Sequence, residues 1–278
     1  MYMAARDENR AKEVIERLDE EGRAPGLWKV IWHDLDLNDP RSARESAEHF
    51  ISRERKLDIL VNNPALIPAI GNVQVLNADD IEKSMAINYL GPYIFTKTIL
   101  LLLESTASFD GADVRIINVG SDGYRYAKYL EYGSKETWNH LFKWYLLPSL
   151  QHYVYSKLAL HLWTNHLGRR LSERRSNALV IITQPGIILS DGAIRPLYSL
   201  TYPSFWIGLV GLVMHPQTTG ACTSVFTACA PRDDPEIFQG AYTYPTNIAV
   251  PRVPIALAKD RQGKLMEFTE EFLQSIGV

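Results

Sequence analysis

The chain has 278 residues, of which 46% are hydrophobic and 22% are charged, so it can bury a sizeable core and lacks the composition of a disordered protein. Its formal net charge of −3 gives no electrostatic reason to expect nucleic acid as a partner. The N-terminus has no basic region followed by an apolar stretch, so we expect a cytoplasmic protein rather than a secreted one.

Helical and strand-like patterns alternate along the chain. Helical spacing covers residues 8–21, 42–52, 79–104 and 150–172, and apolar runs that favour strands cover 28–32, 57–61, 114–119 and 178–182. No repeat or linker separates these segments, so residues 1–278 are predicted to form a single domain. Strands alternating with helices predict an α/β fold with a doubly wound parallel sheet.

The C-terminal third contains two apolar segments and an amphipathic tail. Pro203 interrupts residues 196–214, so this stretch is predicted to be a buried or interfacial helix that does not span a membrane. Cys222 and Cys229, seven residues apart, share a helix face and are predicted to be small core residues, and no spacing indicates a metal site. Residues 265–278 are amphipathic through Phe268, Phe272 and Ile276, so they are expected to pack on the body.

Distinctive residues follow the predicted strands. Asp36 follows the first apolar run, Asn62 and Asn63 the second, Ser121 the third, and Pro185-Gly186 the fourth. In parallel α/β sheets, ligands bind beyond the carboxyl ends of the strands. We therefore expect the functional site at this edge of the sheet.

The helix at 150–172 carries Tyr153 and Lys157. Residues four apart share a helix face, and a nearby ammonium would lower the pKa of the phenol from about 10 toward neutrality, as an acid working near pH 7 requires. The same spacing occurs at Tyr93 with Lys97 and at Tyr124 with Lys128. Only the third pair lies between the strand that leads to Ser121 and the strand that leads to Pro185-Gly186.

Six segments in order resemble landmarks of the short-chain dehydrogenase/reductase family, and within it the branch of retinol dehydrogenases and their fungal relatives. They are Leu-Asp-Leu at 35–37, Leu-Val-Asn-Asn at 60–63, Asn-Tyr-Leu-Gly at 88–91, Ile-Asn-Val-Gly-Ser at 117–121, Tyr153 with Lys157, and Gln-Pro-Gly at 184–186. The resemblance covers nearly the whole chain. It implies a Rossmann-like fold, a homo-oligomer, and an NADP-dependent oxidoreductase that interconverts a carbonyl and an alcohol on a small lipophilic molecule, with a role in secondary metabolism as a family-level expectation.

The resemblance implies four catalytic residues. Tyr153 would exchange a proton with the substrate oxygen, Ser121 would hydrogen-bond the same oxygen, and Lys157 would lower the tyrosine pKa and bind the nicotinamide ribose. Asn88 would hold a water that links Lys157 to solvent. Pro92 lacks the N–H that would bond the Asn88 carbonyl in a continuous helix, which would free this carbonyl for water; alternatively, Gly91-Pro92 only kinks a packing helix.

The resemblance also implies cofactor contacts. Asp36 would contact the adenine, Asn62 and Asn63 the ribose region, and Ile188 and Ser190 the carboxamide. Lys97 either matches a cofactor-associated basic residue or is a solvated helix lysine. Arg6, after the family's second strand, favours the 2′-phosphate of NADP, whereas the adjacent Asp7 keeps NAD open.

The sequence departs from the family in several places. The first strand and its glycine-rich turn, which holds the pyrophosphate, have no counterpart, and their loss would leave unpaired edges in the middle of the sheet. A catalytically silent relative that acts by binding or dimerisation, and a truncated gene product, are therefore alternatives to the enzyme. An epimerase or dehydratase is disfavoured because too few residues follow Gly186 for a large substrate domain.

Three further segments bear on the site. Pro64 removes a backbone donor from the turn after Asn62-Asn63. The long aromatic segment between Ser121 and Tyr153 could shape an apolar substrate pocket or could be an ordinary packed loop. Residues 196–231 match the variable region that covers the substrate, and their apolar part, 197–214, suits a lipophilic substrate, contact with a membrane surface, or a plain buried helix.

Overall fold

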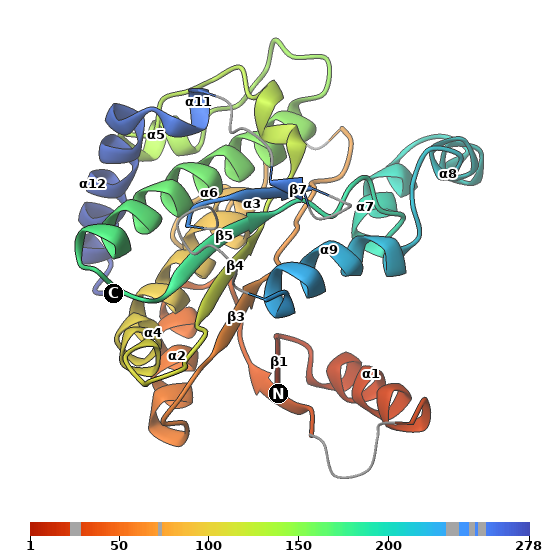
Figure 1. The fold of residues 1–278 in the computed structure, drawn as a ribbon. Coiled ribbons are helices and arrows are strands. Elements are labelled where there is room, and N and C mark those ends of the chain that lie inside the picture. Colours follow the sequence, from red (N-terminus) through yellow and green to blue (C-terminus); the bar gives the residue numbers. More distant parts are fainter. Residues whose placement is uncertain (23–28, 72–73, 232–238, 245–247, 250–253) are drawn as a thin grey trace.

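The computed structural model describes residues 1–22, 29–71, 74–231, 239–244, 248–249 and 254–278. They form an α/β fold in which parallel strands alternate with helices, which confirms the predicted class (Figure 1). The strands are β1 (Tyr2–Ala5), β2 (Ile31–Asp34), β3 (Ile59–Asn62), β4 (Arg115–Val119), β5 (Leu179–Thr183), β6 (Tyr242–Tyr244) and β7 (Ile248–Ala249). The predicted strand at 28–32 is observed later, as β2, and its residue 28 lies outside the described residues.

Helices cover the sheet and extend from it. They are α1 (Glu8–Glu20), α2 (Pro40–Arg53), α3 (Lys83–Met85), the π-helix η1 (Ala86–Leu90), α4 (Gly91–Ala107), the 3₁₀-helix η2 (Asp122–Tyr126), α5 (Lys135–Trp138), α6 (Pro148–Glu173), α7 (Asp191–Ile194), the 3₁₀-helix η3 (Arg195–Ser199), α8 (Pro203–Gly211), α9 (Gln217–Cys229), α11 (Pro254–Leu257) and α12 (Lys259–Ser275). Figure 1 shows α2, α4 and α6 on one side of the sheet and α9 on the other. The sheet is therefore covered on both faces, as its apolar central strands require.

The sheet is split in two. β3, β4, β5 and β6 are parallel neighbours, with β7 antiparallel at the edge, whereas β1 pairs only with β2. Within the described residues, no strand pairs with the other edge of β1 or of β3. On β3, Ile59 is 38% and Val61 43% exposed, although every residue of β4 and β5 is buried. The unpaired edges expected in the middle of the sheet are thus present.

The predicted long helix at 79–104 is interrupted by a wider turn. It begins at Lys83 because the Glu82 carboxylate caps it, accepting from the Met85 N–H at 3.0 Å. In η1, the Gly91 N–H bonds to the Ala86 carbonyl five residues back. Gly91 permits a close approach of backbones, because a Cβ there would lie 2.4 Å from the Leu37 carbonyl oxygen. This packing places η1 beside the end of β2.

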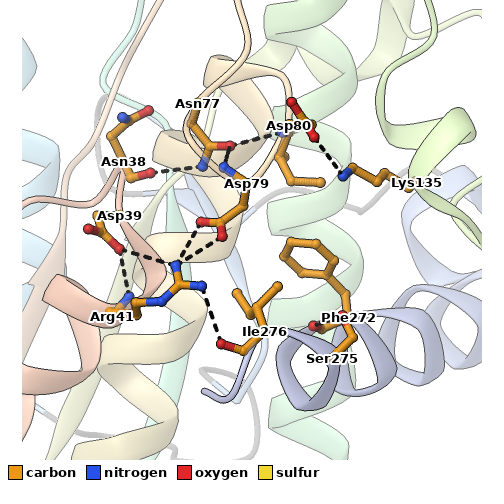
Figure 2. Close-up of polar contacts among 11 residues, drawn as sticks. Asn38, Asp39, Arg41, Asn77, Asp79, Asp80, Lys135, Phe272, Ser275 and Ile276 are labelled. Atoms are coloured by element: carbon orange, nitrogen blue, oxygen red, sulfur yellow. Dashed lines mark hydrogen bonds and ion pairs between the residues drawn. The ribbon is translucent and has the colours of Figure 1, made fainter.

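The C-terminal helix packs on the body as predicted. Phe272 is buried, and Phe268 and Ile276 pack against the core, with Phe268 meeting the Trp138 ring at 4.9 Å. Arg41 at the start of α2 binds the C-terminal end of α12. Its guanidinium donates to Asp79 at 2.9 and 3.1 Å and to the Ile276 carbonyl at 3.3 Å (Figure 2).

One expectation about buried residues is wrong, and for the segment 196–214 the buried alternative is excluded while the interfacial one stays open. Cys222 and Cys229 lie on α9 but are exposed, because this helix packs through Gly220, Thr223 and Thr227 instead. The segment 196–214 is not a buried helix, since no residue of α8 is buried. Among the described residues, one helical stretch, Lys83–Ala107, has the length and apolarity of a membrane span, but 67% of its apolar window is buried inside the protein, as in a core helix.

Candidate active site

Four predicted binding residues converge at the carboxyl ends of β1, β2 and β3. Arg6 follows β1 and Asp36 follows β2. Asn62 is the last residue of β3, and Asn63 comes directly after it. All four residues line one pocket of about 480 Å³. The Arg6 guanidinium lies 4.0 Å from the Asp36 carboxylate and is mostly exposed. The pocket bridges the two parts of the sheet, since its lining includes residues of β1 and of β3.

Asn62 is held by a buried polar network rather than left free to meet a ligand. Its amide donates to Asn118 Oδ1 at 2.8 Å and to Thr96 Oγ1 at 3.0 Å, and the Asn118 amide donates to Thr164 Oγ1 at 2.8 Å. The network ties β3 to β4, α4 and α6. Sequence reasoning missed Asn118, although an asparagine inside the apolar run 115–119 is a signal, because a buried amide needs partners.

Ser121 and Tyr153 meet above the end of β4. The Ser121 hydroxyl hydrogen-bonds the Tyr153 phenol, which projects from α6, and also accepts from the Gly123 N–H at 3.2 Å. Burial raises the pKa of Tyr153, although the bond from Ser121 acts in the opposite direction. Lys157 is not among the groups that shift this pKa here, so the expected lowering by Lys157 stays a prediction. The Lys157 ammonium lies 5.9 Å from the centroid of the tyrosine ring and is engaged elsewhere.

Lys157 is buried and bonded to backbone carbonyls. Its Nζ donates to the Val119 oxygen at 2.8 Å and to the Pro64 oxygen at 2.9 Å. Burial lowers the pKa of Lys157 to about 7. The ammonium thus ties α6 to the end of β4 and to the turn after β3, where Pro64 also lines the pocket.

Asn88 also binds the turn after β3, through the backbone of Leu66. Its Oδ1 accepts from the Leu66 N–H at 2.7 Å, and its Nδ2 donates to the Leu66 oxygen and to Ser156 Oγ, both at 3.0 Å. The helix continues through Gly91-Pro92 by way of the wider turn of η1. The water expected at the Asn88 carbonyl stays a prediction.

Ile188 and Ser190 lie in the loop that follows β5. The Ser190 hydroxyl caps α7 by accepting from the Ala193 N–H at 3.3 Å, and a Cβ on Gly192 would lie 3.7 Å from the Ala65 oxygen. The start of α7 therefore borders the turn that Asn88 and Lys157 hold. Ile188 forms a β-bridge with His215 and packs closely on Gly220.

Lys97 lies outside this site. Its Nζ pairs with Glu270 of α12 at 2.5 Å, and Tyr93 donates to the same carboxylate. Both residues line a second pocket of about 450 Å³, which shares no lining residue with the first. The pair Tyr93 with Lys97 is therefore structural, and so is buried Tyr124, which stacks on His161.

The aromatic segment before Tyr153 mainly builds core. Tyr124, Tyr132 and Trp138 are fully buried, and Tyr132 stacks on Tyr155 with ring centroids 4.4 Å apart. Trp144 is 98% exposed. The ordinary packed loop is thus the better description of this segment than a substrate pocket.

Comparisons with known proteins show the family and the fold of the chain. A family model described as short chain dehydrogenase matches residues 1–143. The chain is 35% identical to a short-chain dehydrogenase/reductase of Armillaria gallica, over 99% of this chain and 85% of the relative, and 29% identical to retinol dehydrogenase 14 of Mus musculus, over 87% and 69%. The fold is similar to that of an NADPH-bound carbonyl reductase from chicken fatty liver, with a TM-score of 0.60, 18% identity, and coverage of 90% of this chain and 87% of that one.

Proposed function

Because the chain belongs to the short-chain dehydrogenase/reductase family, we propose that it is an NADP-dependent oxidoreductase that interconverts a carbonyl and an alcohol on a small lipophilic molecule. One observation carries this proposal. The Ser121 hydroxyl meets the Tyr153 phenol at the carboxyl end of the sheet, with the buried ammonium of Lys157 one helical turn further along α6. A hydroxyl, a phenol and a cation in this arrangement can bind a carbonyl oxygen and give it a proton.

The residues of the first pocket suit part of a dinucleotide. Arg6 would hold a 2′-phosphate, Asp36 the adenine and Asn63 the ribose region, with Asn62 positioning the strand end. Lys157 would hold the nicotinamide ribose, and Ile188 and Ser190 the carboxamide. The carbonyl reductase from chicken fatty liver is NADPH-bound, which supports a preference for NADP over NAD in this chain.

The pyrophosphate does not have an evident cradle in the described residues. The helix that begins beside the pocket is α1, and its first turn carries Glu8 and is capped by Asp7, which accepts from the Arg10 N–H at 3.0 Å. Two carboxylates at a helix N-terminus oppose a bound phosphate, which needs free N–H groups there. The residues therefore fit the adenosine and ribose groups but not the pyrophosphate.

Tyr153 is the residue suited to proton transfer. A bound nicotinamide supplies or takes the hydride, and the protein supplies orientation and proton transfer. Since burial raises the pKa of Tyr153, the phenol keeps its proton at neutral pH and can donate it to a carbonyl oxygen. Ser121 would hydrogen-bond the same oxygen.

The apolar segment 197–214 supports a lipophilic substrate, because it lies one short helix, α7, beyond the loop at Ile188 and Ser190. A role in secondary metabolism rests on the resemblance to fungal relatives. The free thiols of Cys222 and Cys229 fit a reducing, cytoplasmic compartment.

A catalytically silent binding protein is the second candidate. The split sheet and the acidic start of α1 favour it, because both weaken dinucleotide binding. The joined set of Asn88, Ser121, Tyr153 and Lys157 opposes it.

Reduction of a panel of medium-chain aldehydes and aryl ketones by NADPH, followed at 340 nm, tests the proposal. We expect Tyr153→Phe to lower kcat/KM by roughly 10² to 10⁴-fold, since it removes the proton donor. Tyr126→Phe is the matched control, because Tyr126 lies near Ser121 but is 67% exposed, and it should keep wild-type activity. Turnover that survives Tyr153→Phe would exclude the proposed chemistry, and a folded chain without any turnover would favour the silent protein.

A further inference from the structure

Residues 188–215 lead away from the site and return directly beside it, and we call this segment the excursion. A β-bridge joins its two ends: the His215 N–H bonds to the Ile187 oxygen and the Leu189 N–H to the His215 oxygen, both at 2.8 Å. Between them, the chain forms α7, η3 and α8, and Figure 1 shows α8 standing well away from the sheet. The excursion therefore combines an anchored base with a projecting tip.

The tip of the excursion, residues 196–214, is apolar and is not covered by other parts of the protein. Residues 196–214 contain no Asp, Glu, Lys or Arg, and no residue of α8 is buried. Its large side chains are exposed, namely Tyr198 by 62%, Tyr202 by 78%, Phe205 by 63%, Leu209 by 50%, Leu212 by 82% and Val213 by 68%. Soluble proteins rarely leave an apolar patch of this kind in water, so this surface is expected to meet a partner.

Two polar side chains of the tip have hydrogen-bond partners. The Trp206 indole N–H donates to the Thr201 oxygen at 3.0 Å, and the Ser199 hydroxyl donates to the Pro196 oxygen at 2.7 Å. These side chains therefore lose little when water is removed. Tyrosine and tryptophan rings also suit the boundary between lipid and water.

The distribution of apolar residues around α8 indicates which kind of partner would cover it. A second protein copy would cover one face of α8, whereas a helix that is apolar all round needs an apolar medium on every side. The nine residues of α8 span about 13 Å at ~1.5 Å per residue, well short of the roughly 30 Å core of a bilayer. The helix can enter one leaflet but cannot cross.

We propose that residues 196–214 insert into one leaflet of a lipid bilayer and dock the protein there. The docking does not depend on the activity of the enzyme. A consequence that does rest on the proposed function is that a lipophilic substrate would reach the site from the bilayer, because the excursion returns to the loop after β5.

Co-sedimentation of the full chain with phosphatidylcholine vesicles tests the docking without cofactor or substrate. We expect the wild-type protein to sediment with the vesicles. Because residues 196–214 carry no charged side chain, the partition coefficient should change less than twofold with 30% phosphatidylserine or with 0.5 M NaCl. Wild-type protein that stays in the supernatant at millimolar lipid would overturn the proposal.

Two double variants locate the contact. Leu209→Asp with Leu212→Asp should lower the partition coefficient at least tenfold, whereas the matched control, Leu101→Asp with Phe109→Asp, should leave it unchanged. The control removes two side chains that are 77% and 50% exposed on and just after α4. Equal binding of both variants, or a wild-type dimer that the α8 variant converts to a monomer, would contradict lipid docking.

Fluorescence quenching by brominated lipid provides a reading that does not depend on these variants. Trp206→Phe keeps the apolar character of the tip, so this variant should still sediment but should lose the quenchable component that wild-type protein shows. The same quenching in both proteins would place the contact elsewhere.

Discussion

Lys157 is buried beside two carbonyl oxygens, and its pKa of about 7 lies well below the ordinary lysine value of 10.5. Between pH 7 and 10.5 the unfolded chain therefore holds a proton that the folded chain has lost. The free energy of unfolding should rise with pH across this window, because the cost of burying the cation disappears. Urea unfolding at pH 7.5 and 9.5 should show a larger gain for wild-type protein than for Lys157→Met.

The titration of Glu82 contributes little to the change in stability between pH 7.5 and 9.5. Burial raises the pKa of its carboxyl to about 7 from 4.5, so its own contribution to stability is lost as pH rises between 4.5 and 7, below the measured window. An identical pH dependence in wild-type protein and Lys157→Met would show that Lys157 keeps its charge throughout.

Spacing and position could predict Ser121, Tyr153 and Lys157, since a residue after a strand and a pair on one helix face are local features. The partners of Lys157 could not be predicted, because they are carbonyls whose direction depends on loop conformation. Lys97 shows the limit of spacing. It has the same motif as Lys157, but Glu270, 173 residues later, binds it.

The unpaired edges of β1 and β3 are the main departure from a continuous sheet. Amide hydrogens that face an unpaired edge have no ladder partner and exchange readily. Hydrogen–deuterium exchange should be at least tenfold faster for peptides covering β1 and β3 than for those covering β4 and β5. Uniform protection across all four strands would show that another segment or another copy fills the space.

The central strands could be predicted because 114–119 and 178–182 are rich in aliphatic residues and are flanked by turn residues. The wider turn of η1 could not, because it depends on the packing of Gly91 against Leu37. The orientation of α9 could not be predicted either, because its buried face consists of glycine and threonine rather than of its cysteines. Composition alone cannot tell an apolar helix that is buried from one that projects, as α8 does.

Arg41 joins three distant parts of the chain, namely α2, the turn at Asp79 and the end of α12 (Figure 2). The Asp79 side chain is only 9% exposed, so losing its cation leaves a poorly hydrated carboxylate. Arg41→Ala should therefore lower the free energy of unfolding by about 1–2 kcal/mol. Lys12→Ala, which removes an exposed pair with Glu8, should change it by less than about 0.5 kcal/mol, and equal effects would deny the network a structural role.

The proposed activity depends above all on the binding of NADP in the pocket at Arg6 and Asp36. Titration of the purified protein with NADPH and NADH, following nicotinamide fluorescence and thermal stability together, tests this binding without any substrate. We predict saturable binding of NADPH that stabilises the fold by about 2.7 kcal/mol at a hundred times Kd, with weaker binding of NADH, and a loss of this preference in Arg6→Ala. A folded chain whose melting temperature and fluorescence do not respond to millimolar NADPH would contradict a role for this pocket in cofactor binding.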